Sequence, residues 1–188
     1  LAVHLIMACL IFTGCMWVLR GLTPHSPDID KDRKGMRFAA LLLVACLIQI
    51  YLGALVAGLS AGLAFNTWPL MDGALIPSDL FIQNPWWINL FENVKTVQFI
   101  HRMGAYALLA LAFVHWVKMR SYKPSVSADT RAGILFGLIC LQAIFGIVTL
   151  LTQVNIHIAL VHQGMALILL AFVVAHLRGF IGAYPYKA

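Results

Sequence analysis

Charged residues are scarce in this sequence. Aspartate, glutamate, lysine and arginine make up 11% of its 188 residues, whereas 62% of the residues are apolar. A soluble domain typically carries about 25% charged residues, because its surface must stay hydrated. The shortage of charge and the long apolar segments therefore exclude an ordinary soluble domain and predict an all-α integral membrane protein.

Several common functional motifs are also missing. The sequence has no CxxCH for c-type haem attachment, no hydrolytic triad, no phosphate-binding glycine loop and no structural zinc spacing. Its cysteines all lie inside apolar segments, where we expect them to pack rather than to form disulfides. They are Cys9, Cys15, Cys46 and Cys140. Asp72 and Glu92 are too isolated to indicate a carboxylate mechanism.

The first residue, Leu1, already lies inside an apolar segment. No initiator Met and no basic residues precede that segment. A secretory signal needs a positively charged start and a small-residue cleavage site. We therefore expect residue 1 to be a truncation point in a longer protein.

Five segments are long enough to cross the roughly 30 Å hydrocarbon core of a bilayer. They are Leu1–Leu19, Met36–Leu63, Thr96–Val117, Thr130–Leu151 and Ile156–Leu177. Six prolines fall between these segments, as expected for residues that break helices. The sequence therefore predicts five transmembrane helices, of which the last four form a four-helix bundle.

The distribution of basic residues predicts the orientation of these spans. The first and third links are basic, and their basic residues are Arg20, Lys31, Arg33, Lys34 and Arg37, then Lys118, Arg120, Lys123 and Arg131. The second link, from Ala64 to Lys95, has one lysine and three acidic residues. Because positive residues stay on the cytoplasmic or matrix side, the second and fourth links face outward. This asymmetry explains the net charge of +6 and gives no reason to expect nucleic acid as a partner.

Six of the seven histidines lie on the three spans that run from outside to inside. His101 and His162 lie at the same depth on two parallel spans. Ionisable residues within a membrane are costly and usually face the bundle interior, where they serve a function. Two neutral imidazoles facing each other across a bundle form a bis-histidine site for haem iron. Gly104 and Ala166, one turn further on, would leave room for the macrocycle. The alternative is that each histidine is a hydrogen-bonded packing residue.

Two features of the outer side each have two interpretations. Arg102 beside His101 can neutralise a haem propionate with paired hydrogen bonds, or its side chain can snorkel to lipid headgroups. Trp68, Trp86 and Trp87 can cap the haem edges, or they can form an aromatic belt at the membrane interface.

A second pair of histidines gives a rival interpretation. His115 follows His101 by fourteen residues, and His176 follows His162 by the same interval. Fourteen residues span about 21 Å on nearly one helix face. This spacing resembles the two-haem membrane cytochromes b of quinol-oxidising complexes. His115 and His176 lie near the cytoplasmic ends of their spans, which is also the usual place for a histidine with no ligand role.

A short internal repeat indicates a duplicated bundle. Residues Val3 to Ala8 match residues Val161 to Ala166 at Val, His, Met and Ala. Both helices run the same way with the histidine at a similar depth. We therefore expect residues 1–20 to be the last helix of a preceding half, and residues 21–36 to be a cytoplasmic link. Residues 37–188 would then form the second half, with an outer loop at 64–95.

Several longer motifs are similar to those of a known family. Span 2 carries Tyr51-Leu52-Gly53-Ala54-Leu55-Val56-Ala57-Gly58, and the outer loop carries Ala64-Phe65-Asn66-Thr67-Trp68-Pro69-Leu70-Met71-Asp72-Gly73. The loop leads into Val97-Gln98-Phe99-Ile100-His101-Arg102, and span 5 carries Val161-His162-Gln163. Together these motifs resemble the C-terminal part of the haem A synthase family, in the branch shared by alphaproteobacteria and mitochondria. The resemblance covers essentially the whole chain.

The resemblance implies a fold of eight helices in two halves related by a pseudo-two-fold axis. The C-terminal half would hold a b-type haem between His101 and His162, with Arg102 as a further haem-binding residue. The N-terminal half would bind haem O, and His4 would supply one of its iron ligands as a catalytic residue. The other residues of that half precede residue 1, so we expect the fragment alone to be inactive. Some relatives have a cysteine pair in the outer loops, but none occurs between Ala64 and Lys95.

The implied activity is that of an oxidoreductase. It would oxidise a ring methyl of haem O through a hydroxymethyl stage to a formyl group, giving haem A for a terminal oxidase. The implied cofactor is haem b with its iron, and the substrate is haem O. Membrane lipid surrounds such a protein. The partners that the resemblance suggests are haem O synthase, an electron-transfer protein and a second copy of the chain. The expected location is the bacterial inner membrane or the mitochondrial inner membrane.

Overall fold

The computed structural model describes residues 1–28, 33–122 and 125–185. Five helices in this part of the chain are long and apolar enough to cross a membrane. They are α1 (Ala2–Leu22), α2 (Lys34–Gly58), α4 (Val94–Tyr122), α5 (Val126–Leu151) and α6 (Ile156–Gly179). Apart from one isolated bridge between Met71 and Ala74, the described residues contain no β-structure. The predicted all-α membrane fold is confirmed. Two of the basic link residues, Lys31 and Lys123, lie outside the described residues.

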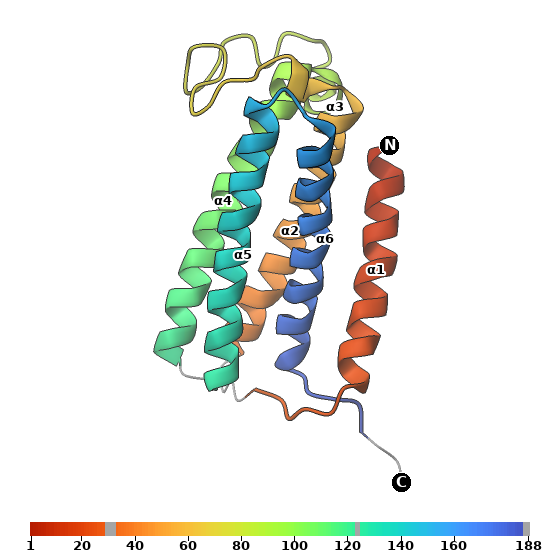
Figure 1. Cartoon of the computed structure of the whole chain (residues 1–188), viewed down its shortest axis with the longest axis vertical. Coiled ribbons are helices and arrows are strands. Elements are labelled where there is room, and N and C mark those ends of the chain that lie inside the picture. The colour runs from red at the N-terminus through yellow and green to blue at the C-terminus, as the bar shows by residue number, and fades with distance from the viewer. Residues whose placement is uncertain (29–32, 123–124, 186–188) are drawn as a thin grey trace.

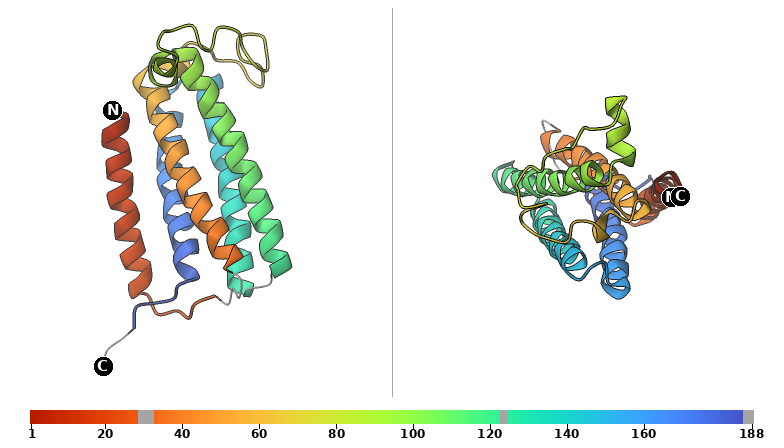
Figure 2. Two further views of the ribbon diagram at one scale, coloured as in Figure 1. Left: turned by 180° about the vertical axis from the view of Figure 1, so that it is seen from behind. Right: turned by 90° about the horizontal axis from the view of Figure 1, so that it is seen from above.

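Four of the long helices surround a common centre (Figure 1). Helices α2 and α5 each pack against both α4 and α6, so α4 and α6 lie on one diagonal of the bundle. Helix α1 stands beside the bundle and contacts α2 and α6 (Figure 2). The end of the bundle that carries residues 64–95 is called the outer end. The opposite end, where the basic links lie, is called the inner end.

The helix ends follow from local sequence. Asn93, Ser125 and Asn155 precede α4, α5 and α6, and their side-chain oxygens accept hydrogen bonds from backbone N–H groups of the first turns. Such side chains satisfy donors that have no partner within the helix. Helix α2 ends at Gly58 rather than at the predicted Leu63. Ser60 adopts left-handed backbone geometry with φ of 52°, which separates α2 from a short 3-10 turn, η1 (Ala61–Leu63).

The packed centre of the bundle lies toward the inner end. Its central cluster consists of buried residues from all four bundle helices: Leu42, Cys46, Leu108, Ala112, Leu135, Ile139, Leu169 and Val173. Every member lies further inward along its helix than His101 or His162 lies on α4 or α6. The outer part of the bundle is therefore packed differently from the inner part.

The outer loop is a folded cap rather than a loose connection. It contains a 3-10 turn, η2 (Trp86–Ile88), and a short helix, α3 (Asn89–Glu92). Asn89 is fully buried, and its amide donates to the carbonyl oxygens of Gln83 and Trp86 at 2.9 and 2.8 Å. Asn93 in turn donates to the Asn89 side-chain oxygen at 3.0 Å. These asparagines satisfy backbone groups that the turns leave without partners, and so they fix the cap above the bundle.

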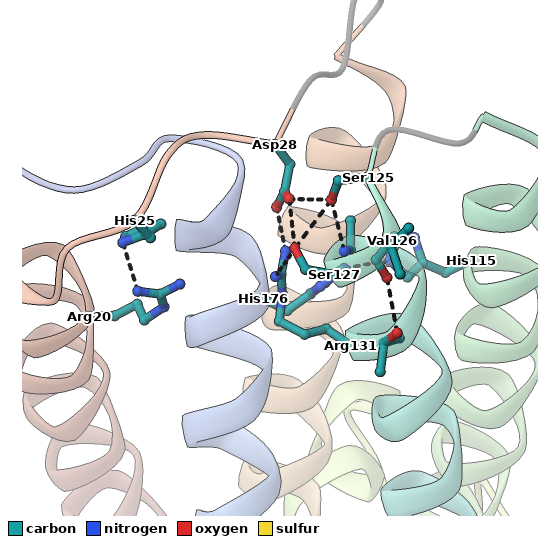
Figure 3. Close-up of polar contacts among 11 residues, drawn as sticks. Arg20, His25, Asp28, His115, Ser125, Val126, Ser127, Arg131 and His176 are labelled. Atoms are coloured by element: carbon teal, nitrogen blue, oxygen red, sulfur yellow. Dashed lines mark hydrogen bonds and ion pairs between the residues drawn. The ribbon is translucent and has the colours of Figure 1, made fainter.

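A second set of side-chain contacts lies at the inner end (Figure 3). The Asp28 carboxylate accepts hydrogen bonds from Ser125, Ser127 and Arg131, and we call these four residues the inner clasp. The backbone N–H of Asp28 also donates to the carbonyl oxygen of Gly179 at 3.0 Å. The clasp therefore ties the link after α1 to the inner ends of α5 and α6.

All four cysteines are free thiols in the structure. Cys9 and Cys46 are buried packing residues as predicted, and Cys140 is half-buried. Cys15 is exposed on α1, so the prediction of a buried packing role is wrong for this residue. Cys15 instead lines a shallow apolar groove with Ile11, Gly14 and Val18.

Candidate haem-binding site

His101 and His162 lie in the outer halves of the two diagonal helices α4 and α6. Both residues are half-buried. Because α4 and α6 run in the same direction, equal depth along the two helices brings these histidines to the same level of the bundle. The structure thus places the two histidines at one level of the bundle, on diagonally opposed helices.

Each of these histidines is held by a glutamine from a neighbouring helix. The Gln49 side-chain amide on α2 donates to the His101 carbonyl oxygen at 2.9 Å and lies 3.0 Å from His101 Nδ1. The Gln142 amide on α5 donates to the His162 carbonyl oxygen at 2.9 Å. The two histidine–glutamine pairs are thus equivalent across the bundle.

A glycine one turn beyond each glutamine makes room for the imidazole. A Cβ atom at Gly53 would lie 3.1 Å from His101 Cε1, and one at Gly146 would lie 3.0 Å from His162 Cε1. Gln49 and Gly53 on α2 therefore correspond to Gln142 and Gly146 on α5. Reasoning from the sequence missed this repeated Gln-x-x-x-Gly pattern. The sequence feature that could have revealed this pattern is a glutamine at matching depth in each of two otherwise apolar spans.

Gly104 has a different role from the predicted one. A Cβ atom at Gly104 would overlap Gln49 Oε1 and would approach Leu52 Cδ1 to 3.3 Å. The space beside Gly104 is therefore filled by Gln49. This glycine makes room for the side chain that holds His101, and not directly for a macrocycle.

The residues around the diagonal pair fit a bis-histidine haem. A haem iron takes four nitrogens from its macrocycle and two axial ligands from the protein, so two histidines complete it. The part of the chain that the structure describes holds no group of three or more His, Cys, Asp or Glu side chains that could bind a bare metal ion. The central cluster ends inward of the pair, and glycines flank both rings. The donors and the packing thus suit a flat ligand in the outer half of the bundle.

Arg102 points toward the outer loop and is 9% exposed. Its guanidinium donates to the carbonyl oxygens of Phe65 at 3.1 Å and Leu70 at 3.4 Å. Its Nε has no partner. This burial under the cap contradicts the snorkelling interpretation, and it leaves one donor for a further acceptor on the outer side of His101.

The three tryptophans of the loop lie on its surface. Trp68, Trp86 and Trp87 are all exposed. Trp68 donates from its indole nitrogen to the Tyr106 hydroxyl at 2.9 Å. Their exposure favours the aromatic belt, because residues that cap a buried ligand would themselves be covered.

His4 does not join the pair in the bundle. It is exposed on the outer part of α1. Helical spacing puts it on the same stripe of α1 as Ile11, Cys15 and Val18, which line the apolar groove. The opposite side of α1 carries Cys9, which is buried against Leu170 and Val174 of α6. His4 therefore faces away from the four-helix bundle.

The inner histidines form a direct contact of their own (Figure 3). His115 Nε2 lies 2.8 Å from His176 Nε2, and both side chains are fully buried. Phe38 and Phe180 pack against the two rings. An iron between two imidazoles needs their nitrogens roughly 4 Å apart, because each metal–nitrogen bond is about 2 Å long. This hydrogen-bonded pair does not fit a second haem.

Replacing His115 with leucine should destabilise the protein without removing haem. The change leaves His176 Nε2 buried without a partner, which costs about 1–3 kcal/mol of unfolding free energy. The double variant His115→Leu with His176→Leu should have an unfolding free energy closer to that of the wild type, since both partners then become apolar. Thermal unfolding in detergent and haem content per protein measure the two effects. Loss of half the haem in His115→Leu would support the two-haem alternative.

Comparisons with known proteins agree with the family resemblance of the sequence motifs. The sequence model of the family described as cytochrome oxidase assembly protein matches residues 1–174. The chain is 65% identical over 185 residues to the heme A synthase of Agrobacterium fabrum, a match that covers 98% of this chain and 51% of that relative. It is 58% identical over 186 residues to the heme A synthase of Rhizobium leguminosarum bv. trifolii, covering 99% of this chain and 51% of the relative. No solved structure matches the chain.

A third relative is matched over a similar share of each chain. The heme A synthase of Sinorhizobium medicae is 55% identical over 185 residues, which cover 98% of this chain and 50% of that protein. The chain thus spans about half the length of the curated relatives that it matches.

Proposed function

The chain belongs to the cytochrome oxidase assembly protein family, and on this basis we propose that it forms the haem b-binding half of a haem A synthase. The complete enzyme is an oxidoreductase. It converts a ring methyl of haem O to the formyl group of haem A, which a terminal oxidase then uses. The relatives named heme A synthase support this activity, since their identity to the chain extends over nearly all of its residues.

The observation that carries the proposal is the diagonal histidine pair. His101 and His162 share one level of the bundle, and each is held by an equivalent glutamine and flanked by an equivalent glycine. Such symmetry suits a ligand that lies between the two imidazoles and binds both. A haem iron is a ligand of this kind.

In this proposal His101 and His162 bind the iron of a b-type haem through their Nε2 atoms. Bound there, the haem supplies a redox centre that relays electrons to or from the substrate haem. Arg102, with its unpartnered Nε, binds a propionate beneath the outer cap. The inward central cluster excludes water from the inner side of the site.

His4 belongs to the other half of the enzyme in this proposal. It is exposed on the stripe of α1 that faces away from the bundle, where a further set of helices can pack. We propose that His4 binds the iron of the substrate haem there and acts as a catalytic residue. Residues 1–20 then complete the substrate half, residues 21–36 form the link, and residues 37–188 form the haem b half. This fragment alone is expected to be inactive.

The protein is a multi-pass membrane protein with five spans in this chain. We propose the inner membrane as its location, because its relatives are bacterial enzymes. Its proposed partners are haem O synthase, which would supply the substrate, and an electron-transfer protein. A second copy of the chain is a further proposed partner.

The test is a pigment analysis of the protein at its full natural length. We expect wild type to contain one b-type haem, seen in the reduced-minus-oxidised spectrum, and to yield haem O or haem A on extraction. His101→Met and His162→Met should each lose the b-type haem and haem A formation. The reason is that each change removes one of the two histidine ligands of the iron.

The matched control is His157→Met, which replaces an exposed histidine at the start of the same helix α6. It should keep the pigment and the activity of wild type. If haem A formation and the b-type haem both survive in His101→Met and His162→Met, the proposed function is wrong. Two b-type haems without haem O or haem A would instead support an electron-transfer cytochrome.

A further inference from the structure

We propose that Gln49 and Gln142 are positioning residues, which accept the Nδ1–H hydrogen bonds of His101 and His162 when these imidazoles bind haem iron through Nε2. The inference rests on the proposed haem site. To that site the inference adds two residues that set the orientation and the electron donation of both histidine ligands. The glutamines themselves undergo no reaction.

The requirement for such acceptors follows from the chemistry of imidazole. A neutral histidine that binds a metal through Nε2 carries its proton on Nδ1. That N–H is buried with the ligand and needs an acceptor, because an unpartnered buried donor costs free energy. An acceptor at this position fixes the ring orientation and makes the imidazole a stronger donor to the metal.

The structure holds a suitable acceptor beside each histidine. The side-chain oxygens of Gln49 and Gln142 are both buried and have no hydrogen-bond partner. At His162 the Nδ1 atom is also buried and without a partner. The Gln142 amide nitrogen is already anchored on the carbonyl oxygen of this same histidine at 2.9 Å. An unpartnered donor and an unpartnered acceptor thus belong to two residues that are already joined by a side chain–backbone hydrogen bond.

At His101 the same glutamine amide contacts the ring itself. Gln49 Nε2 lies 3.0 Å from His101 Nδ1 and donates to the His101 carbonyl oxygen at 2.9 Å. When Nδ1 carries the proton, the Gln49 amide must turn so that Oε1 faces Nδ1 and moves clear of the His101 carbonyl oxygen, because two oxygens repel each other. That carbonyl oxygen then keeps the regular hydrogen bond of helix α4. Gln49 can therefore serve as the acceptor at His101 after a change of its side-chain torsions.

The repeat of the arrangement argues against a packing role. Gln49 and Gly53 on α2 hold a histidine of α4, and Gln142 and Gly146 on α5 hold a histidine of α6. The two units have the same spacing, the same backbone anchor and the same unpartnered oxygen. A glutamine that only packs needs neither a free acceptor nor a counterpart across the bundle.

The experiment compares Gln49→Leu and Gln142→Leu with wild type in the protein at its full natural length. We expect each variant to release haem to apomyoglobin about 10-fold faster, as is typical when the outer partner of a metal ligand is lost. We also expect the midpoint potential of the b-type haem to rise, since a weaker imidazole donor favours ferrous iron. A tenfold loss of preference for the ferric form corresponds to about 59 mV for one electron.

Two further variants separate positioning from folding. Gln49→Glu and Gln142→Glu retain a side-chain oxygen acceptor, so they should return the potential to the wild-type value or below it. The matched control is Thr149→Val on α5, which removes a hydroxyl that donates only to Phe145 of its own helix at 2.7 Å. It should change neither the potential nor the electron paramagnetic resonance g-values of the ferric haem.

The outcomes distinguish this inference from the proposed function. If wild type carries a b-type haem that depends on His101 and His162, while both leucine variants keep its potential, g-values and release rate, the positioning role is wrong and the haem site stands. If wild type carries no such haem, the proposed function itself fails. Potentials raised in both leucine variants and restored by glutamate would establish the role.

Discussion

Gly146→Ala should lose most of the b-type haem that His162 binds. The added methyl group would lie 3.0 Å from His162 Cε1 and 3.6 Å from both ring nitrogens. Because Nε2 must reach the iron along a fixed direction, the displaced ring cannot keep its geometry as a ligand. Haem content per protein should fall roughly tenfold, the size of effect seen when a group that orients a metal ligand is lost.

Gly53→Ala should have a similar effect through His101, since its methyl group would lie 3.1 Å from His101 Cε1. Haem content is measured by the pyridine haemochrome spectrum of the purified full-length protein. Gly137→Ala on α5 and Gly164→Ala on α6 are the matched controls, because an added Cβ at either glycine meets nothing within 4 Å. Both controls should bind haem normally and gain helix stability. Normal haem content in Gly53→Ala and Gly146→Ala would contradict the assignment of both histidines as ligands.

Asp28→Asn should lower the free energy of unfolding by about 3–5 kcal/mol, because it leaves the charge of Arg131 without its counterion. The Asp28 side chain is 6% exposed and that of Arg131 is 20% exposed, so water compensates little for the lost ion pair. Ser125 and Ser127, which donate to the same carboxylate, also lose their partner or bind a weaker one. Thermal unfolding in detergent measures the change.

Asp129→Asn is the matched control for the inner clasp. Asp129 pairs with Arg120 at 3.8 Å, and the side chains are 36% and 64% exposed. An exposed pair of this kind contributes about 0.2–1 kcal/mol. The unfolding temperature should therefore fall much more in Asp28→Asn than in Asp129→Asn. Equal shifts would mean that the clasp does not hold the link after α1 to the inner ends of α5 and α6.

The two histidine pairs show which features follow from the sequence and which follow only from the tertiary structure. Helical spacing alone made His101 with His162 and His115 with His176 equivalent pairs of candidates, because the inner histidine follows the outer one by fourteen residues on each helix. In the structure the inner pair is closed by a hydrogen bond of 2.8 Å, and the outer pair is flanked by glycines and held by glutamines. The two pairs differ because aromatic rings pack around the inner pair, whereas small residues lie around the outer pair. The ligand role of His101, His162, Arg102 and His4 stays a prediction.

Sequence alone was enough to predict the membrane-spanning helices, their approximate bounds and the depth of each histidine. These features depend on local quantities, namely the length of an apolar run and the rise of 1.5 Å per helical residue. The side chains that meet across the bundle could be identified only in the folded chain. Gln49 and His101 are 52 residues apart, and Asp28 and Arg131 are 103 apart. Their contacts depend on how each helix is rotated about its axis, and that rotation is set by packing against all its neighbours at once.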